Sequence, residues 1–187
     1  MANIIKLNSQ IKYYEIEDKI ICSGKDETII TVLENKEVIY NDDHIPNFNY
    51  CDEHGYIYYK GKINGIGIGV FVPGSIILTI KRKLNGGEAL SDKFSKALSE
   101  YFKSKNLGSV RQDNNDILVD GYKVASGGEI MVNGYNYLGY QISINQDIEA
   151  IREICHKKSV KPPKALSDWG ITTKEIENFC EEYWTNN

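Results

Sequence analysis

A tight turn in the second half of the chain constrains the fold more than any other feature of the sequence. Two short strand-like runs, residues 117–119 and 122–124, flank Asp120-Gly121. Because Asp-Gly supplies the positive φ angles that two-residue hairpin turns require, the two runs are predicted to be adjacent antiparallel strands. They follow a segment, 89–105, whose apolar residues recur every three or four positions, as in an amphipathic helix. A helix that leads directly into such a hairpin favours an α+β fold.

The first half of the chain is typical of strands, because short β-branched and aromatic runs alternate with turn-forming clusters. This pattern predicts a β-meander over residues 11–16, 19–22, 28–33, 38–40 and 56–59. A second hairpin is expected over 66–72 and 75–82, joined by the turn signal Pro73-Gly74.

After the Asp-Gly hairpin, two further strands are expected over 129–132 and 138–145, and a short helix over 147–157. Thr172 and Glu175 have the spacing of a capping box, which predicts a terminal helix. No repeat or linker divides the chain, so residues 1–187 are expected to form one α+β domain. Its sheet should be mixed and largely antiparallel, with helices flanking one face.

Charge and composition exclude several classes of function. The net charge is −4 and the main basic cluster is Lys81-Arg82-Lys83, which argues against a nucleic-acid partner. The longest apolar stretch, 66–80, is broken by glycine and proline, so no membrane span is expected. The first residues lack the features of a secretory signal, and we expect a cytoplasmic protein. Heavy use of Asn, Ile, Lys and Tyr is typical of the AT-rich genome of a bacterium or phage.

The cysteines and histidines indicate no resident metal, because none of them has the spacing of metal ligands. They are Cys22, Cys51, Cys155, Cys180, His44, His54 and His156. Cys155 and His156 are adjacent on the predicted helix 147–157, where neighbours point about 100° apart, so they do not form a ready dyad. A buried structural role is the simpler interpretation of Cys155 and of Cys180, which lies on an apolar helical stripe.

Two segments can carry chemistry. Gly65, Gly67 and Gly69 can let the backbone approach a phosphate or cofactor closely, or can let a buried strand bend beneath a neighbour. They are not a dinucleotide fingerprint, since strand-like residues follow where that motif needs a helix. Lys123 alternates with apolar neighbours on the returning strand of the hairpin, so it points away from Val124, to solvent or to a cleft.

Several segments, taken in order, resemble the catalytic domain of lipoate–protein ligases, octanoyl (lipoyl) transferases and biotin–protein ligases. The strongest is residues 115–127, Asn-Asp-Ile-Leu-Val-Asp-Gly-Tyr-Lys-Val-Ala-Ser-Gly, which is similar to that family's Asn-Asp, strand, Asp-Gly-x-Lys signature. Residues 65–76 are similar to its glycine-rich motif, with a Pro-Gly turn most like the octanoyltransferase version. Residues 50–62, 139–148 and 165–171 are similar to its remaining segments. The resemblance covers about residues 47–184.

The resemblance implies that a lipoyl or octanoyl group is transferred to a lysine of a lipoyl- or biotinyl-type carrier domain. It implies that the Lys123 ammonium stabilises negative charge developing at the acyl carbonyl and leaving group. Asn115 and Asp116 would hold nucleotide phosphates, directly or through Mg²⁺. The other substrate-binding residues it implies are Lys62, Gly65, Gly67, Gly69, Gly74, Ser75, Ser126 and Gly127. Cys155 lies near the position of the acyl-accepting cysteine of octanoyltransferases.

Departures from the family pattern leave more than one function open. Lys60-Gly61-Lys62 stands where the ligases carry an arginine pair, and Phe71 stands where a histidine is common. A ligase would use ATP and Mg²⁺ with lipoate or octanoate, whereas a transferase would take its acyl group from an acyl carrier protein thioester. The alternative from another class is a catalytically degenerate member, of the kind that a phage could encode, which binds a carrier protein, a small acyl ligand or a host factor without catalysis.

Overall fold

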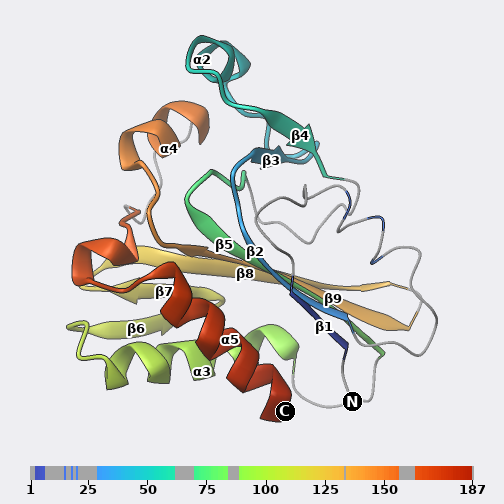
Figure 1. Cartoon of the computed structure of the whole chain (residues 1–187), viewed down its shortest axis with the longest axis vertical. Coiled ribbons are helices and arrows are strands. Elements are labelled where there is room, and N and C mark those ends of the chain that lie inside the picture. The colour runs from blue at the N-terminus through green and yellow to red at the C-terminus, as the bar shows by residue number, and fades with distance from the viewer. Residues whose placement is uncertain are drawn as a thin grey trace.

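The structure is a computed structural model that describes residues 3–6, 15, 18, 20, 29–61, 70–83, 89–132, 134–155 and 163–186. Its strands are β1 (Asn3–Lys6), β2 (Ile29–Glu34), β3 (Val38–Tyr40), β4 (Tyr58–Lys60), β5 (Ser75–Lys83), β6 (Val110–Asp113), β7 (Asp116–Val119), β8 (Tyr122–Val132) and β9 (Tyr135–Ser143). Its helices are α2 (Phe48–Glu53), α3 (Leu90–Ser104), α4 (Ile148–Cys155), the short 3₁₀ helix η1 (Leu166–Trp169) and α5 (Thr173–Asn186). Figure 1 shows their arrangement.

One sheet of seven strands dominates the fold, in the order β1-β2-β5-β9-β8-β7-β6. β1 runs parallel to β2, and every other neighbouring pair in this sheet is antiparallel. β3 and β4 form a separate parallel pair. The predicted class, an α+β fold with a mixed, largely antiparallel sheet flanked by helices, is confirmed.

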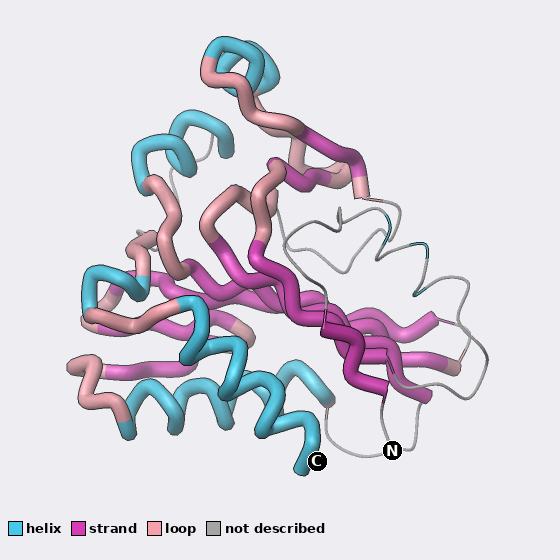
Figure 2. The backbone as a smooth tube through the Cα atoms, in the orientation of Figure 1, coloured by secondary structure: helices cyan, strands magenta, loops and turns pink. Residues whose placement is uncertain are grey.

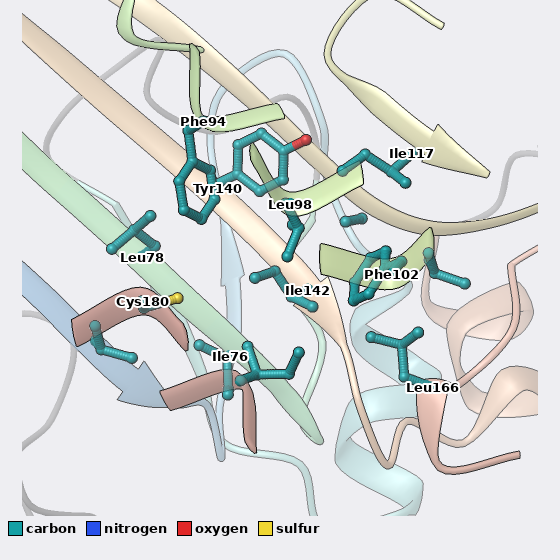
Figure 3. Packing of buried hydrophobic residues seen from close by; sticks show 14 of the residues in the cluster. Ile76, Leu78, Phe94, Leu98, Phe102, Ile117, Tyr140, Ile142, Leu166 and Cys180 are labelled. Carbon is teal, nitrogen blue, oxygen red and sulfur yellow. The ribbon is translucent and has the colours of Figure 1, made fainter. Parts of the chain in front are cut away.

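Helices α3 and α5 cover one face of the large sheet (Figures 1 and 2). α3 lies against β6 to β9, and α5 lies against β2 and β5. Because side chains alternate along a strand, Ile76, Leu78 and Ile80 of β5 all face these helices. They meet the apolar stripe of α3, where Phe94 and Phe102 are fully buried (Figure 3). This face is the main core. On the opposite face, Ile29, Leu33 and Ile77 pack into a second buried cluster with Ile20, Ile39 and Phe71.

The hairpin predicted from Asp120-Gly121 is confirmed as β7 and β8. Asp120 has φ 51° and Gly121 has φ 82°, the positive pair that such a turn requires. The strands expected over 129–132 and 138–145 are also paired, as parts of β8 and β9. The predicted helices over 89–105 and 147–157 correspond to α3 and α4.

The prediction of a meander in the first half is wrong. β3 and β4 are parallel rather than consecutive antiparallel strands, and α2, which the sequence did not reveal, lies between them. The expected hairpin of 66–72 with 75–82 is also wrong, because β2 and β9 occupy both edges of β5. Instead Phe71 bridges to Ile39. The predicted strands 11–16 and 19–22 lie mostly outside the described residues, and Glu15 and Ile20 within them have helical backbone.

The capping box that begins α5 is confirmed. The backbone N–H of Thr172 donates to Glu175 Oε2 at 3.0 Å, and the N–H of Glu175 donates to Thr172 Oγ1 at 3.3 Å. Glu175 also pairs with Lys105, just after α3, at 2.7 Å. This contact joins the two helices that cover the sheet. None of the helices in the described part of the chain is long and apolar enough to cross a membrane.

Glu175 makes the stability of this helix pair depend on pH. Hydrogen bonds from Lys105 and Thr172 lower the pKa of Glu175 from 4.5 to about 2. A carboxyl with a lowered pKa stabilises the fold above its unfolded pKa and loses that contribution as the pH falls toward its folded pKa. Glu175→Gln, which keeps a capping acceptor, should therefore have a lower Tm than wild type at pH 7, and the difference should close between pH 4.5 and pH 2.

Thermal melts monitored by circular dichroism at several pH values would measure this difference. Glu177→Gln is the matched control, since Glu177 pairs with Lys174 of its own helix, at 3.4 Å. A Tm difference for Glu175→Gln that persists unchanged at pH 2 would contradict the assignment.

Candidate functional site

A β-bulge decides where Lys123 points. In the β7–β8 ladder Ile117 pairs with Ala125, but the next pair is Leu118 with Lys123, so β8 has one extra residue, Val124. Val124 and Ala125 both lie in the main core. Two successive residues on one face reverse the alternation, as bulges do, and turn Lys123 to the face away from α3 and α5. The sequence-based prediction that Lys123 points away from Val124 agrees with this placement.

On that face Lys123 meets Asp116. Lys123 Nζ lies 3.5 Å from Asp116 Oδ1, and the two side chains are 34% and 20% exposed. Asp116, the first residue of β7, is the register partner of Ser126 in β8, and Ser126 in turn pairs with Gln141 in β9. A row of polar residues, Asp116, Ser126 and Gln141, therefore crosses three strands beside the Lys123 ammonium group. We call it the polar row.

The polar row extends to the start of β5. Gln141 Nε2 donates to Ser75 Oγ at 3.2 Å, and Ser75 Oγ donates to the carbonyl of Val72 at 2.9 Å. Ser75 is fully buried. Gly74 precedes it with φ 85°, and a Cβ there would lie 2.7 Å from the carbonyl oxygen of Asn145. A glycine is needed at position 74 for this close approach of the two loops, independently of any contact with a substrate.

Asn115 and Gly127 are connected through Tyr140 of β9. The Tyr140 hydroxyl donates to the carbonyl of Asn115 at 2.7 Å and lies 3.1 Å from Ser95 Oγ of α3. The Tyr140 ring occupies the space above Gly127, where a Cβ would lie 1.9 Å from the ring. Gly127 therefore faces the core and makes room for Tyr140, and Tyr140 fixes the turn that leads into Asp116.

Cys155 is the last residue of α4 and lies in a small apolar cluster beside Cys51 and Ile151. Burial raises the pKa of the Cys155 thiol to about 11, although the charge of Lys123 acts in the opposite direction. The two predicted catalytic residues are thus close enough to interact electrostatically. At neutral pH, however, Cys155 is a thiol rather than a nucleophilic thiolate.

Four predicted substrate-binding residues, Lys62, Gly65, Gly67 and Gly69, lie outside the described residues. Around them, Lys60 forms an exposed ion pair with Asp42 at 2.6 Å. Phe71, at the position where the family pattern has a histidine, is 6% exposed and packs with Ile39 and Ile77. Phe71 is thus a core residue in this chain.

The described residues contain no group of three His, Cys, Asp or Glu side chains that could hold a metal ion. At the site, Asp116 supplies a carboxylate and Lys123 an ammonium group, and an ammonium can interact with a phosphate or an acyl carbonyl.

The sequence did not single out Gln141. It is an amide between Tyr140 and Ile142, and the alternation of β9 places it on the site face. A polar residue at such a position is the signal that could have identified it.

No protein-family profile and no curated protein matches the sequence. Solved structures do match. Ta0514 of T. acidophilum, assigned as a lipoate protein ligase and solved with bound lipoic acid, has a TM-score of 0.75 at 12% identity and covers 98% of this chain and 83% of its own. A bi-partite lipoate protein ligase from Thermoplasma acidophilum, studied with its E2 lipoyl domain, has a TM-score of 0.72 at 11% identity, covering 99% and 82%.

A biotin protein ligase from Aquifex aeolicus, in complex with biotin and ATP, has a TM-score of 0.54 at 11% identity and covers 96% of this chain and 67% of its own. At these identities the matches establish the fold. This chain has the fold of the lipoate- and biotin-protein ligases.

Proposed function

We propose that this protein transfers a lipoyl or octanoyl group to a lysine of a lipoyl-type carrier domain. The observation that carries the proposal is the pair of Lys123 and Asp116, 3.5 Å apart and partly buried on the face of the sheet away from α3 and α5. A fixed ammonium in a partly desolvated site stabilises negative charge more strongly than one in water. The fold of lipoate protein ligases and the sequence signature at 115–127 support the same reaction.

In the proposed reaction the amine of the carrier lysine attacks the acyl carbonyl carbon, an amide bond forms, and the bond to the activating group breaks. The Lys123 ammonium neutralises the charge that develops on the carbonyl oxygen and on the leaving group. Asp116 holds the ammonium in place, and the Tyr140–Asn115 hydrogen bond holds Asp116 at the start of β7. The chain thus supplies orientation and electrostatic stabilisation.

We assign ATP and Mg²⁺ as the source of activation. Bound Mg²⁺ would offset charge on the phosphates; Asp116 would hold the Mg²⁺, and the Asn115 amide would donate to the phosphates. An acyl carrier protein thioester is the other donor, and it would act through Cys155 as a covalent intermediate. The raised pKa of Cys155 favours ATP over that route, because only the thiolate is a good nucleophile.

Replacement of Cys155 separates the two routes. If ATP supplies the activation, Cys155→Ala should keep transfer within about twofold of wild type, since removal of one partly buried thiol costs little. The measurement is the rate of carrier acylation with lipoate, ATP and Mg²⁺, followed by intact mass. Loss of transfer in Cys155→Ala, with the Tm unchanged, would instead support the thioester route.

The second candidate function is binding without catalysis, to a carrier domain or a small acyl ligand. It is favoured by Lys60, which is engaged with Asp42 in place of a phosphate-binding arginine, and by the core position of Phe71. A lysine also lacks the bidentate geometry with which arginine holds phosphate.

One experiment tests both functions. The purified protein is incubated with an apo lipoyl domain, once with lipoate, ATP and Mg²⁺ and once with octanoyl-acyl carrier protein, and the intact mass of the lipoyl domain is measured. We expect an added acyl mass that requires ATP. An unchanged carrier mass in both reactions, from a protein that is folded and binds the lipoyl domain, would support the binding module instead.

A further inference from the structure

A chain of hydrogen bonds that begins inside the fold fixes the direction of the Gln141 amide. The carbonyl of Val72 accepts two of these bonds, from Gln146 Nε2 at 3.0 Å and from Ser75 Oγ at 2.9 Å. Both donor side chains are buried. A serine hydroxyl has one hydrogen atom, so once Ser75 donates to Val72 its oxygen can only accept.

The group of Gln141 that faces Ser75 must therefore be the amide NH₂. Gln141 Nε2 donates to Ser75 Oγ at 3.2 Å. The oxygen of an amide lies on the other side of the same carbon atom, so Gln141 Oε1 points away from Ser75. Gln141 is partly exposed and makes no other hydrogen bond within the described part of the chain. The fold thus holds an oriented acceptor that the described residues leave unused.

This acceptor lies across the polar row from the pair of Lys123 and Asp116. Gln141 and Asp116 are the two ends of the row, with Ser126 between them. Neighbouring strands are about 4.8 Å apart, so the two end side chains leave the sheet about 10 Å from each other. All three residues of the row are partly exposed, in contrast to the second buried cluster on this face. A substrate group can therefore reach the row from solvent.

A neutral acceptor at this distance suits the amine that attacks the acyl carbonyl. A carbonyl oxygen held by the Lys123 ammonium lies about 3 Å from it, and an attacking nitrogen lies about 3–3.5 Å from the carbonyl carbon. A hydrogen bond of about 3 Å from that nitrogen to Gln141 Oε1 completes a span of about 10 Å. The attacking amine is neutral, so it can donate one N–H to the amide oxygen while its lone pair points at the carbon.

We propose that Gln141 Oε1 accepts a hydrogen bond from the amine of the carrier lysine and orients that amine toward the acyl carbonyl. The inference rests on the proposed acyl transfer. As the amide bond forms, the activating group leaves with the bonding electron pair, and the proton that the amine loses passes to solvent. An amide oxygen does not take up that proton at neutral pH, so Gln141 acts by orientation and not as a base.

The test separates activation of the acid from its transfer. Gln141→Leu removes the amide at similar size, and Ser75→Ala is the matched control, because it breaks the same hydrogen bond but leaves the Gln141 oxygen in place. Activation is measured without a carrier, as lipoate-dependent exchange of pyrophosphate into ATP. Transfer is measured as the single-turnover acylation of a saturating apo lipoyl domain. Gln141→Leu should keep exchange within about twofold of wild type and slow transfer at least about tenfold, whereas Ser75→Ala should slow transfer by about threefold at most.

A purely structural role of Gln141 predicts a different pattern. If Gln141 only holds Ser75 and its turn, the two variants should slow transfer equally, which would overturn the inference. It is also overturned if exchange slows together with transfer, or if Gln141→Leu transfers as fast as wild type from either donor. Absence of transfer by folded wild type from both donors would instead refute the proposed function. Thermal melts establish that each variant folds, and Gln141→Met takes the place of Gln141→Leu if that variant does not.

Discussion

Lys123→Ala should abolish acyl transfer while the fold remains intact. Removal of one electrostatic donor from a charge-stabilising site costs about 10²–10³-fold in kcat. The cost in stability should be small, because the ion pair with Asp116 is partly exposed and such pairs contribute at most about 1 kcal/mol. The measurement is the single-turnover rate of carrier acylation, alongside the Tm.

Lys164→Ala is the matched control for Lys123→Ala. The backbone N–H of Lys164 donates to the carbonyl of Lys123 at 3.2 Å, so the two lysines are neighbours. The Lys164 ammonium, however, lies over the rings of Trp169 and Tyr122, at 3.9 and 5.2 Å from their centroids. Loss of this charge should leave kcat near the wild-type value. A Lys123→Ala variant that keeps more than about a third of wild-type activity would refute the catalytic assignment.

The placement of Lys123 also illustrates how much the sequence could predict. The Asp-Gly turn and the capping box are local signals, in which a few neighbouring residues determine the backbone, and both are confirmed. The side of the sheet on which Lys123 lies was predicted from its neighbour Val124, which is the extra residue of the β-bulge. The pairing of that hairpin with Pro163 and Lys164 was not predictable, because it joins segments about 40 residues apart.

The prediction of a meander in the first half of the chain failed for the same reason, because it depended on pairing between segments that are distant in the sequence. Strand-like runs reveal which residues are extended but not which strand each will meet, and β5 pairs with β2 and β9 rather than with the segment just before it. Gln141 was missed because it looks like an ordinary solvent-facing position in a strand. Only the register places it beside Ser126.

The second large effect concerns the core rather than the site. Gly127→Ala should destabilise the fold by about 3 kcal/mol, at the upper end for an overpacked core. The new Cβ would lie 1.9 Å from Cδ2 of Tyr140, a fully buried ring that packs edge-on against Phe94 at 5.0 Å. The ring cannot withdraw without breaking the hydroxyl contacts with Asn115 and Ser95. For a chain of this size the Tm should fall by about 6–12 °C.

Gly134→Ala is the control for this loss. Gly134 lies in the turn between β8 and β9, where a Cβ meets no atom within 4 Å, and its φ of 82° adds only the backbone strain of about 1 kcal/mol. A Gly127→Ala variant as stable as Gly134→Ala would show that the Tyr140 ring yields easily.

A double-mutant cycle of Gly127→Ala with Tyr140→Leu then tests whether core and site are coupled. Each change alone destabilises the fold, but the smaller side chain leaves room for the new Cβ, so the double variant should lose less stability than the sum. Transfer should not recover with stability, because Tyr140→Leu also removes the hydrogen bond to the carbonyl of Asn115, which precedes Asp116. Recovery of both together would mean that Tyr140 acts only through packing, whereas recovery of stability alone would identify its hydroxyl as what positions Asp116 against Lys123.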